Sequence, residues 1–120
     1  MNEPEDAPPA TALDQPAPLA VPATRVLYPG QSVVNGPTAL TMDSRGDLTV
    51  TLRGAVTWSS GTAGRGVRTV FQDDGNFVVY AADNGTAWSS RTDGHHGAVL
   101  VITGSGEVYI RYQGAKLWQA

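Results

Sequence analysis

The chain contains no cysteine, which excludes disulfide bonds, thiolate metal sites and cysteine nucleophiles. It also lacks any apolar run near the roughly 20 residues that a membrane-spanning helix needs. Charges are few and slightly acidic in balance, with 8 Lys plus Arg against 11 Asp plus Glu and a net charge of −3. This balance argues against nucleic-acid binding, which normally requires a basic stripe. The 120 residues suffice for one domain.

Helical patterning is missing as well. The chain has 14 Gly, and no stretch of residues 25–120 keeps a 3.6-residue apolar period over two turns. We therefore expect an all-β protein.

Proline is concentrated at the start of the chain. Residues 1–24 hold six of the 8 prolines, four acidic residues and no base, and they show no apolar periodicity. We predict that residues 1–24 form a disordered, acidic Pro/Ala-rich arm and that residues 25–120 form the folded domain. The arm does not resemble a signal peptide, because it is acidic and has no apolar segment.

A period of about 30 residues organises the rest of the chain. The three tryptophans recur every 30 residues, each after a glycine at nearly the same spacing: Trp58, Trp88 and Trp118 after Gly46, Gly75 and Gly106. Such a period indicates one supersecondary unit repeated three times. We call these units one (41–58), two (71–88) and three (102–118).

Each unit is predicted to be a β-hairpin followed by a turn into a strand that carries the tryptophan. The turn glycine sets a register that places Phe71 opposite Phe77, and in the same way Met42 opposite Leu48 and Ile102 opposite Val108. Each unit then presents one apolar face. Three units around a pseudo-threefold axis bury these faces, whereas one unit alone does not.

Strand alternation leaves a mainly polar set on the outer face of unit two. Its members are Gln72, Asp74, Asn76, Val78 and Tyr80. Amides, a carboxylate and a phenol suit the hydroxyls of a neutral sugar, because a hydroxyl donates and accepts hydrogen bonds at once. With one charge in the set, an anionic ligand is not favoured.

These five residues, in the sequence QDDGNFVVY, resemble the mannose-binding signature of the bulb-type (monocot) mannose-specific lectins. Residues 27–32 and the Trp-Ser-Ser segments at Trp58 and Trp88 are similar to that family too. The resemblance covers residues 25–120 and implies a type II β-prism of three four-stranded antiparallel sheets around a tryptophan core. Because members commonly carry a disulfide in the first repeat, its absence favours a divergent, bacterial member.

The resemblance also implies a role for each residue of the signature. Asp74 and Asn76 would hold the axial O2 of mannose, Gln72 would reach O3, Tyr80 would bond O4, and Val78 would pack on the C–H surface of the sugar. The other two units depart from the signature, so we predict a single competent site. At the five positions unit one has Asp43, Arg45, Asp47, Thr49 and Thr51, and unit three has Thr103, Ser105, Glu107, Tyr109 and Arg111.

Three other motifs have simpler interpretations. Residues 45–47 spell the integrin-type tripeptide Arg-Gly-Asp, but the glycine is the turn glycine of unit one. His95 and His96 have no evident third ligand, so we predict a loop and no metal. Asn84-Gly85-Thr86 is a glycosylation sequon that also makes a good hairpin turn. No catalytic triad or carboxylate pair is suggested, so we predict neither enzymatic activity nor a cofactor.

The sequence thus predicts a lectin whose partners are mannose-containing glycans, with no nucleic-acid partner and no membrane insertion. A homodimer that exchanges residues 116–120 stays open. We expect a secreted or cell-surface protein whose export signal is absent from this chain, with a cytoplasmic location as the alternative. Two other functions also stay open: a structural or interaction module that has lost sugar binding, and an antibacterial protein that uses the sugar site for targeting.

Overall fold

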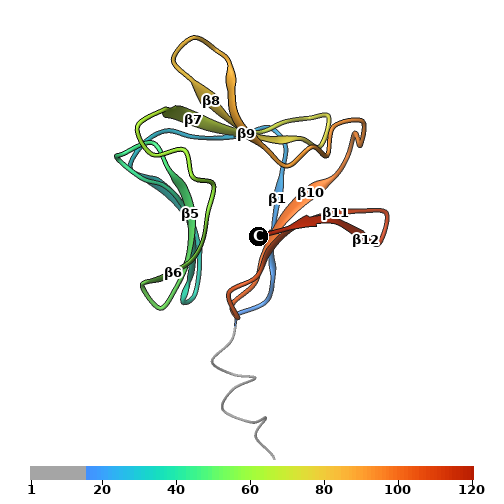
Figure 1. Cartoon of the computed structure of the whole chain (residues 1–120). Helices are drawn as coiled ribbons and strands as arrows, with labels where there is room; N and C mark the ends of the chain where they lie inside the picture. Colours follow the sequence, from blue (N-terminus) through green and yellow to red (C-terminus); the bar gives the residue numbers. More distant parts are fainter. Residues whose placement is uncertain (1–15) are drawn as a thin grey trace, which may run out of the picture.

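The computed structural model describes residues 16–120, which form twelve β-strands and no helix. The strands make three four-stranded antiparallel sheets, and Figure 1 shows these sheets as three walls around a common interior. The fold is an all-β β-prism, as predicted. No helix among the described residues is long and apolar enough to cross a membrane.

Each sheet is built around one of the three units. The unit-one sheet has the order β3 (Gln31–Asn35), β4 (Thr38–Met42), β5 (Leu48–Leu52) and β6 (Ala55–Ser59). The unit-two sheet has the order β2 (Arg25–Leu27), β7 (Gly66–Phe71), β8 (Phe77–Ala81) and β9 (Thr86–Ser89). The unit-three sheet has the order β1 (Leu19–Pro22), β10 (Val99–Ile102), β11 (Val108–Tyr112) and β12 (Ala115–Gln119).

The predicted start of the folded domain at residue 25 is wrong. Leu19–Pro22 forms β1 and pairs along its whole length with β10, which lies far from it in sequence. Val21 points inward and is buried in the core. Burial of this side chain and pairing of the β10 edge explain why a segment with so little patterning is ordered. The rest of the predicted arm, residues 1–15, lies outside the described residues.

The predicted hairpin registers are confirmed. Phe71 pairs with Phe77, and the matching pairs of the other two units form as expected. Gly75 has a φ of 89°, the left-handed conformation that glycine adopts readily. A Cβ at this position would lie 2.7 Å from the backbone oxygen of His95, so close approach of the next loop also requires glycine here.

The core contains inward-facing aliphatic side chains from all three sheets, together with Phe71 and Phe77. The three tryptophans pack against this core and meet one another edge to face, with ring centroids 5.1 to 5.4 Å apart. They are only partly buried, whereas the resemblance implied a core made of tryptophan. The fully buried centre is therefore aliphatic and phenylalanine-rich, and the indole rings join the three sheets beside it.

Candidate functional site

The five signature residues lie on or beside the β7–β8 hairpin. Phe77 and Val79 point into the core, so the alternating Asn76, Val78 and Tyr80 share the outer face of the unit-two sheet. Gln72 lies opposite Asn76, because its backbone N–H donates to the Asn76 backbone oxygen across the turn at 2.8 Å. The structure therefore brings the predicted residues together on one hairpin.

The side-chain amide of Asn76 has two distinct halves. Its Oδ1 accepts hydrogen bonds from the Ser89 hydroxyl at 2.9 Å, the Ser90 hydroxyl at 3.3 Å and the Thr92 backbone N–H at 3.2 Å. These bonds tie the hairpin to the segment that follows Trp88. The Nδ2 group donates to no acceptor among residues 16–120, so its two N–H bonds are available to a ligand.

Asp74 lies in the turn with an exposed side chain. Its Oδ1 accepts a hydrogen bond from the Asn76 backbone N–H at 3.0 Å, the Asx-turn geometry that fixes the direction of the carboxylate. The Asp74 backbone oxygen accepts from the His95 N–H at 2.8 Å, so the next loop supports the turn. The hairpin therefore presents a held carboxylate beside the amide donors of Asn76.

Gln72 and Tyr80 contact each other directly, the Gln72 Nε2 donating to the Tyr80 hydroxyl. Val78 lies on the same face between them in the strand pattern, yet its side chain is only 3% exposed. The resemblance implied a Val78 that packs against a sugar. In the structure Val78 is buried between its sheet neighbours Val70 and Ser89.

One residue of this face, Arg68 in β7, is not part of the predicted set. It pairs with Tyr80 in the sheet, and its guanidinium carbon lies 4.7 Å from the centre of the Tyr80 ring. The expectation that this face carries a single charge is therefore wrong. The predicted register, continued back along β7 from the Phe71–Phe77 pair, would have found Arg68.

In unit one, Asp47 takes the place of Asn76 and is 6% exposed. Its carboxylate holds the segment after Trp58 by accepting bonds from four donors: the Ser59 hydroxyl at 2.6 Å, the Ser60 hydroxyl at 3.0 Å, the Gly61 N–H at 3.0 Å and the Thr62 N–H at 3.2 Å. Burial raises the pKa of Asp47, but these hydrogen bonds outweigh it and hold the pKa below its usual range. A carboxylate has no N–H to offer a ligand.

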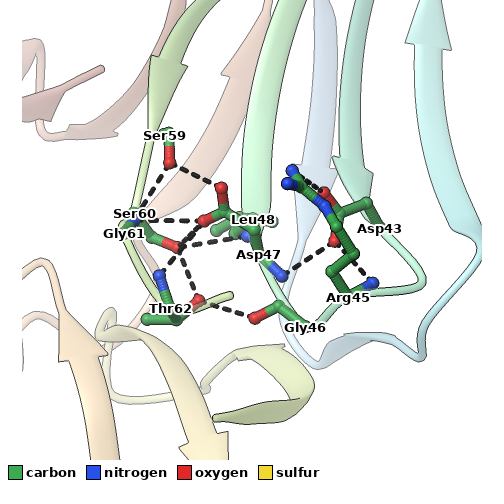
Figure 2. A network of polar contacts seen from close by, with 9 residues as sticks. All are labelled: Asp43, Arg45, Gly46, Asp47, Leu48, Ser59, Ser60, Gly61 and Thr62. Carbon is green, nitrogen blue, oxygen red and sulfur yellow. Dashed lines mark hydrogen bonds and ion pairs between the residues drawn. The ribbon is translucent and has the colours of Figure 1, made fainter. Parts of the chain in front are cut away.

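Asp43 and Arg45 of unit one bind each other. The Arg45 guanidinium and the Asp43 carboxylate form an ion pair at 2.9 Å, and the other Asp43 oxygen accepts the backbone N–H groups of Arg45 and Asp47 (Figure 2). Because the Asp47 carboxylate is buried, the Arg-Gly-Asp tripeptide does not present its acid to solvent.

Unit three is different again. The Thr103 hydroxyl oxygen accepts hydrogen bonds from the backbone N–H groups of Ser105 and Glu107, so it is used within the turn of unit three. Lys116 lies over the ring of Tyr109, with Nζ 4.4 Å from the ring centre, and Arg111 is exposed where unit two has Tyr80. None of the five signature positions of unit three carries an amide side chain.

The two histidines engage different partners. The His95 Nδ1 lies 2.9 Å from the Thr92 backbone oxygen, and the His96 Nδ1 lies 2.9 Å from the exposed Asp73 carboxylate. Within residues 16–120, no group of three or more metal-ligating side chains is gathered in one place. Asn84 lies in the predicted turn between β8 and β9, with a φ of 65°.

No protein-family model and no curated protein sequence matches the chain. Solved structures do resemble it. The Polygonatum cyrtonema lectin, solved with a monomannoside, is 29% identical over 80% of this chain and 89% of its own, with a TM-score of 0.67. A monocot mannose-binding lectin from Gastrodia elata is 23% identical over 87% and 96%, with a TM-score of 0.68. The lectin of Marasmius oreades is 20% identical over 87% and 89%, with a TM-score of 0.75.

The fold thus defines a β-prism of the kind found in lectins, which are carbohydrate-binding proteins without enzymatic activity. Its structural neighbours include mannose-binding lectins of monocots, and among these the Polygonatum cyrtonema lectin, at 29% identity, supports the family resemblance seen in the sequence. The Gastrodia elata and Marasmius oreades structures, below 25% identity, support the fold alone.

Proposed function

We propose that the protein is a lectin that binds mannose or mannose-terminated glycans on the outer face of the unit-two hairpin. The observation that carries the proposal is that the oxygen of the Asn76 side-chain amide is hydrogen-bonded within residues 16–120, whereas its nitrogen is not. Ser89, Ser90 and Thr92 occupy its oxygen, which leaves its N–H donors without an acceptor among residues 16–120, on the same turn as the Asp74 carboxylate. A donor and an acceptor side by side match a sugar hydroxyl, which accepts from one and donates to the other.

The sugar would complete the site by displacing the Gln72–Tyr80 contact. Separation of these side chains frees an amide and a phenol for two further hydroxyls of the sugar. The covered Val78 is also the observation that favours the second candidate, a β-prism module that keeps the fold without binding sugar. In that case the Gln72–Tyr80 contact would be a permanent part of the surface.

One site per chain follows from the comparison of the three hairpins. Asp47 and Glu107 stand where unit two has the amide of Asn76, and neither side chain offers an N–H donor. A single shallow site would bind free mannose with a Kd on the order of millimolar. We propose that attachment to glycan-bearing surfaces depends on several chains acting together, as in a homodimer, and takes place outside the cell.

Titration of the chain with methyl α-mannoside tests the proposal, with methyl α-glucoside as the control because the two sugars differ only at C2. We expect saturable binding of the mannoside and weaker binding of the glucoside. Binding of neither sugar at tens of millimolar would favour the module without sugar binding.

A further inference from the structure

Arg68 is held firmly at one end of the proposed site. Besides its contact with the Tyr80 ring, its Nη2 donates to the Asn84 Oδ1 at 3.1 Å. Both partners belong to the unit-two sheet or its β8–β9 turn, so the guanidinium position follows from the hairpin itself. A side chain held in this way loses little conformational entropy when it binds a ligand.

This guanidinium has unused binding capacity. Arginine carries five N–H donors, and in the described part of the chain only the bond to Asn84 uses one of them. The ion pairs formed by residues 16–120 are those of Arg45 with Asp43 and of His96 with Asp73, so Arg68 is a half-buried cation with no anionic partner there. A guanidinium with free donors matches the geometry of a carboxylate or a phosphate.

The fold does not require an arginine at this position. In the unit-one sheet the residue paired with Thr51 is Ala39, and in the unit-three sheet the residue paired with Arg111 is Val99. Both sheets form with a small apolar side chain where unit two has Arg68. The sheet therefore does not need the arginine, which occurs in the one unit that carries the signature residues.

Arg68 also lies within reach of a sugar held by Asp74 and Asn76. Gln72 pairs with Asn76 across the turn, and its side chain extends along the face to the hydroxyl of Tyr80, the residue whose ring contacts the Arg68 guanidinium. The Gln72 side chain thus spans the distance between the turn end and the Tyr80 end of the site. The single carboxylate, Asp74, is at the turn end, and the cation is at the Tyr80 end.

We infer that Arg68 is a specificity-determining residue, and that the site prefers a mannose-type sugar that carries an anionic group, a carboxylate or a phosphate. The inference rests on the proposed function. The sugar hydroxyls bind the Asp74–Asn76 pair, and the anionic group accepts hydrogen bonds from the guanidinium of Arg68. The gain over the neutral sugar is a charge-assisted bond to a preorganised partner, which we expect to tighten binding about tenfold at low salt.

The test compares three ligands on the full chain by calorimetry: methyl α-mannoside, mannose 6-phosphate and mannuronate. We expect at least one anionic sugar to bind about tenfold more tightly than the neutral one, and the tighter of the two identifies the anionic group. In Arg68→Gln the advantage should disappear, so that the anionic sugars bind this variant no more tightly than methyl α-mannoside does. The control is Arg65→Gln, which makes the same charge change at an exposed arginine before β7 and should keep the preference.

Each outcome separates the inference from the proposed function. Equal affinity of the parent for all three sugars overturns the role of Arg68 and leaves the lectin function standing. Binding of none of them overturns both. An anionic preference that survives Arg68→Gln, or that disappears equally in Arg65→Gln, contradicts the assignment to Arg68. Thermal melting checks that the variants are folded. If Arg68→Gln does not fold, Arg68→Lys takes its place. This variant keeps the charge without the planar guanidinium and should lose part of the preference.

Discussion

Asp47 and Asn76 support the same turn in two different sheets through the same atom, Oδ1. In each case this oxygen accepts a hydroxyl, from Ser60 or Ser90, and the backbone N–H of the threonine two residues further on. The difference between them is the second polar atom of the side chain. In Asp47 it is an oxygen that binds Ser59, and in Asn76 it is a nitrogen with two donors and no acceptor among residues 16–120.

The buried carboxylate of Asp47 should make the stability of the protein depend on pH. Its hydrogen bonds lower its pKa in the folded state, so the stabilisation is complete above the unfolded-state pKa of about 4 and is lost as pH falls through the folded-state pKa. Melting temperatures measured from pH 7 to pH 2 should fall below pH 4 in the parent, and less steeply in Asp47→Asn. Parallel curves for the two proteins would contradict this role.

Thr62 and Thr92 form a matched pair for testing how the turn supports the site. The hydroxyl of each lies within hydrogen-bond distance of the hydroxyl of the serine two residues earlier. It donates to the backbone oxygen of a turn glycine, Thr62 to Gly46 at 2.7 Å and Thr92 to Gly75 at 2.6 Å. Replacing either threonine by valine should cost about 1–3 kcal/mol of unfolding free energy. Only Thr92→Val should also weaken mannoside binding, because the Thr92 hydroxyl contacts Ser90, whose hydroxyl donates to Asn76.

For Thr62→Val and Thr92→Val, denaturant unfolding measures the unfolding free energy and calorimetry measures the affinity for the mannoside. An equal loss of sugar affinity in both variants would show that the effect is global and not local to unit two.

The tryptophan cluster should be a major source of stability even though its rings are partly exposed. Trp88 contacts both other indoles and also lies 6.0 Å from Phe77, so Trp88→Ala removes contacts among all three sheets. We expect a loss of about 3 kcal/mol in unfolding free energy, with Trp88→Phe less severe. A melting temperature within two degrees of the parent for Trp88→Ala would contradict this.

Cross-linking of cells should depend on assembly, because each chain has one proposed site. Avidity adds factors of about 10² to 10⁴ when several sites act together. Agglutination of mannose-bearing cells should therefore occur only where light scattering gives a mass above the 12.6 kDa of one chain. In the structure β12 pairs with β11 of its own chain, so exchange of residues 116–120 between subunits would have to replace that pairing. Strong agglutination by a monomer would contradict the count of one site.

Local patterning predicts the hairpins well. Gly46, Gly75 and Gly106 all adopt positive φ, and alternation on either side of them sorts core residues from outer ones. The pairing of β1 with β10 was not predictable in the same way, because four residues carry too little periodicity to identify a partner that lies far along the chain. The domain boundary was therefore placed too late.

The candidate site shows the same division between local and long-range information. Its five residues follow from one hairpin, and the structure gathers them as expected. Arg68 and the covered Val78 depend on the neighbouring strand and on how long side chains meet across the face, which the signature alone does not describe. The support that Ser89, Ser90 and Thr92 give to Asn76 likewise comes from a separate segment.

The most direct test of the account is calorimetric titration of Asn76→Asp with methyl α-mannoside. Asp47 shows that a carboxylate can hold this turn, so the variant should keep the fold and the parental melting temperature while losing both N–H donors at the site. The reciprocal variant Asp47→Asn serves as the control and should bind the mannoside as the parent does. We predict that Asn76→Asp, folded, shows no measurable mannoside binding. Binding with the affinity of the parent would contradict the assignment of the site to the amide of Asn76.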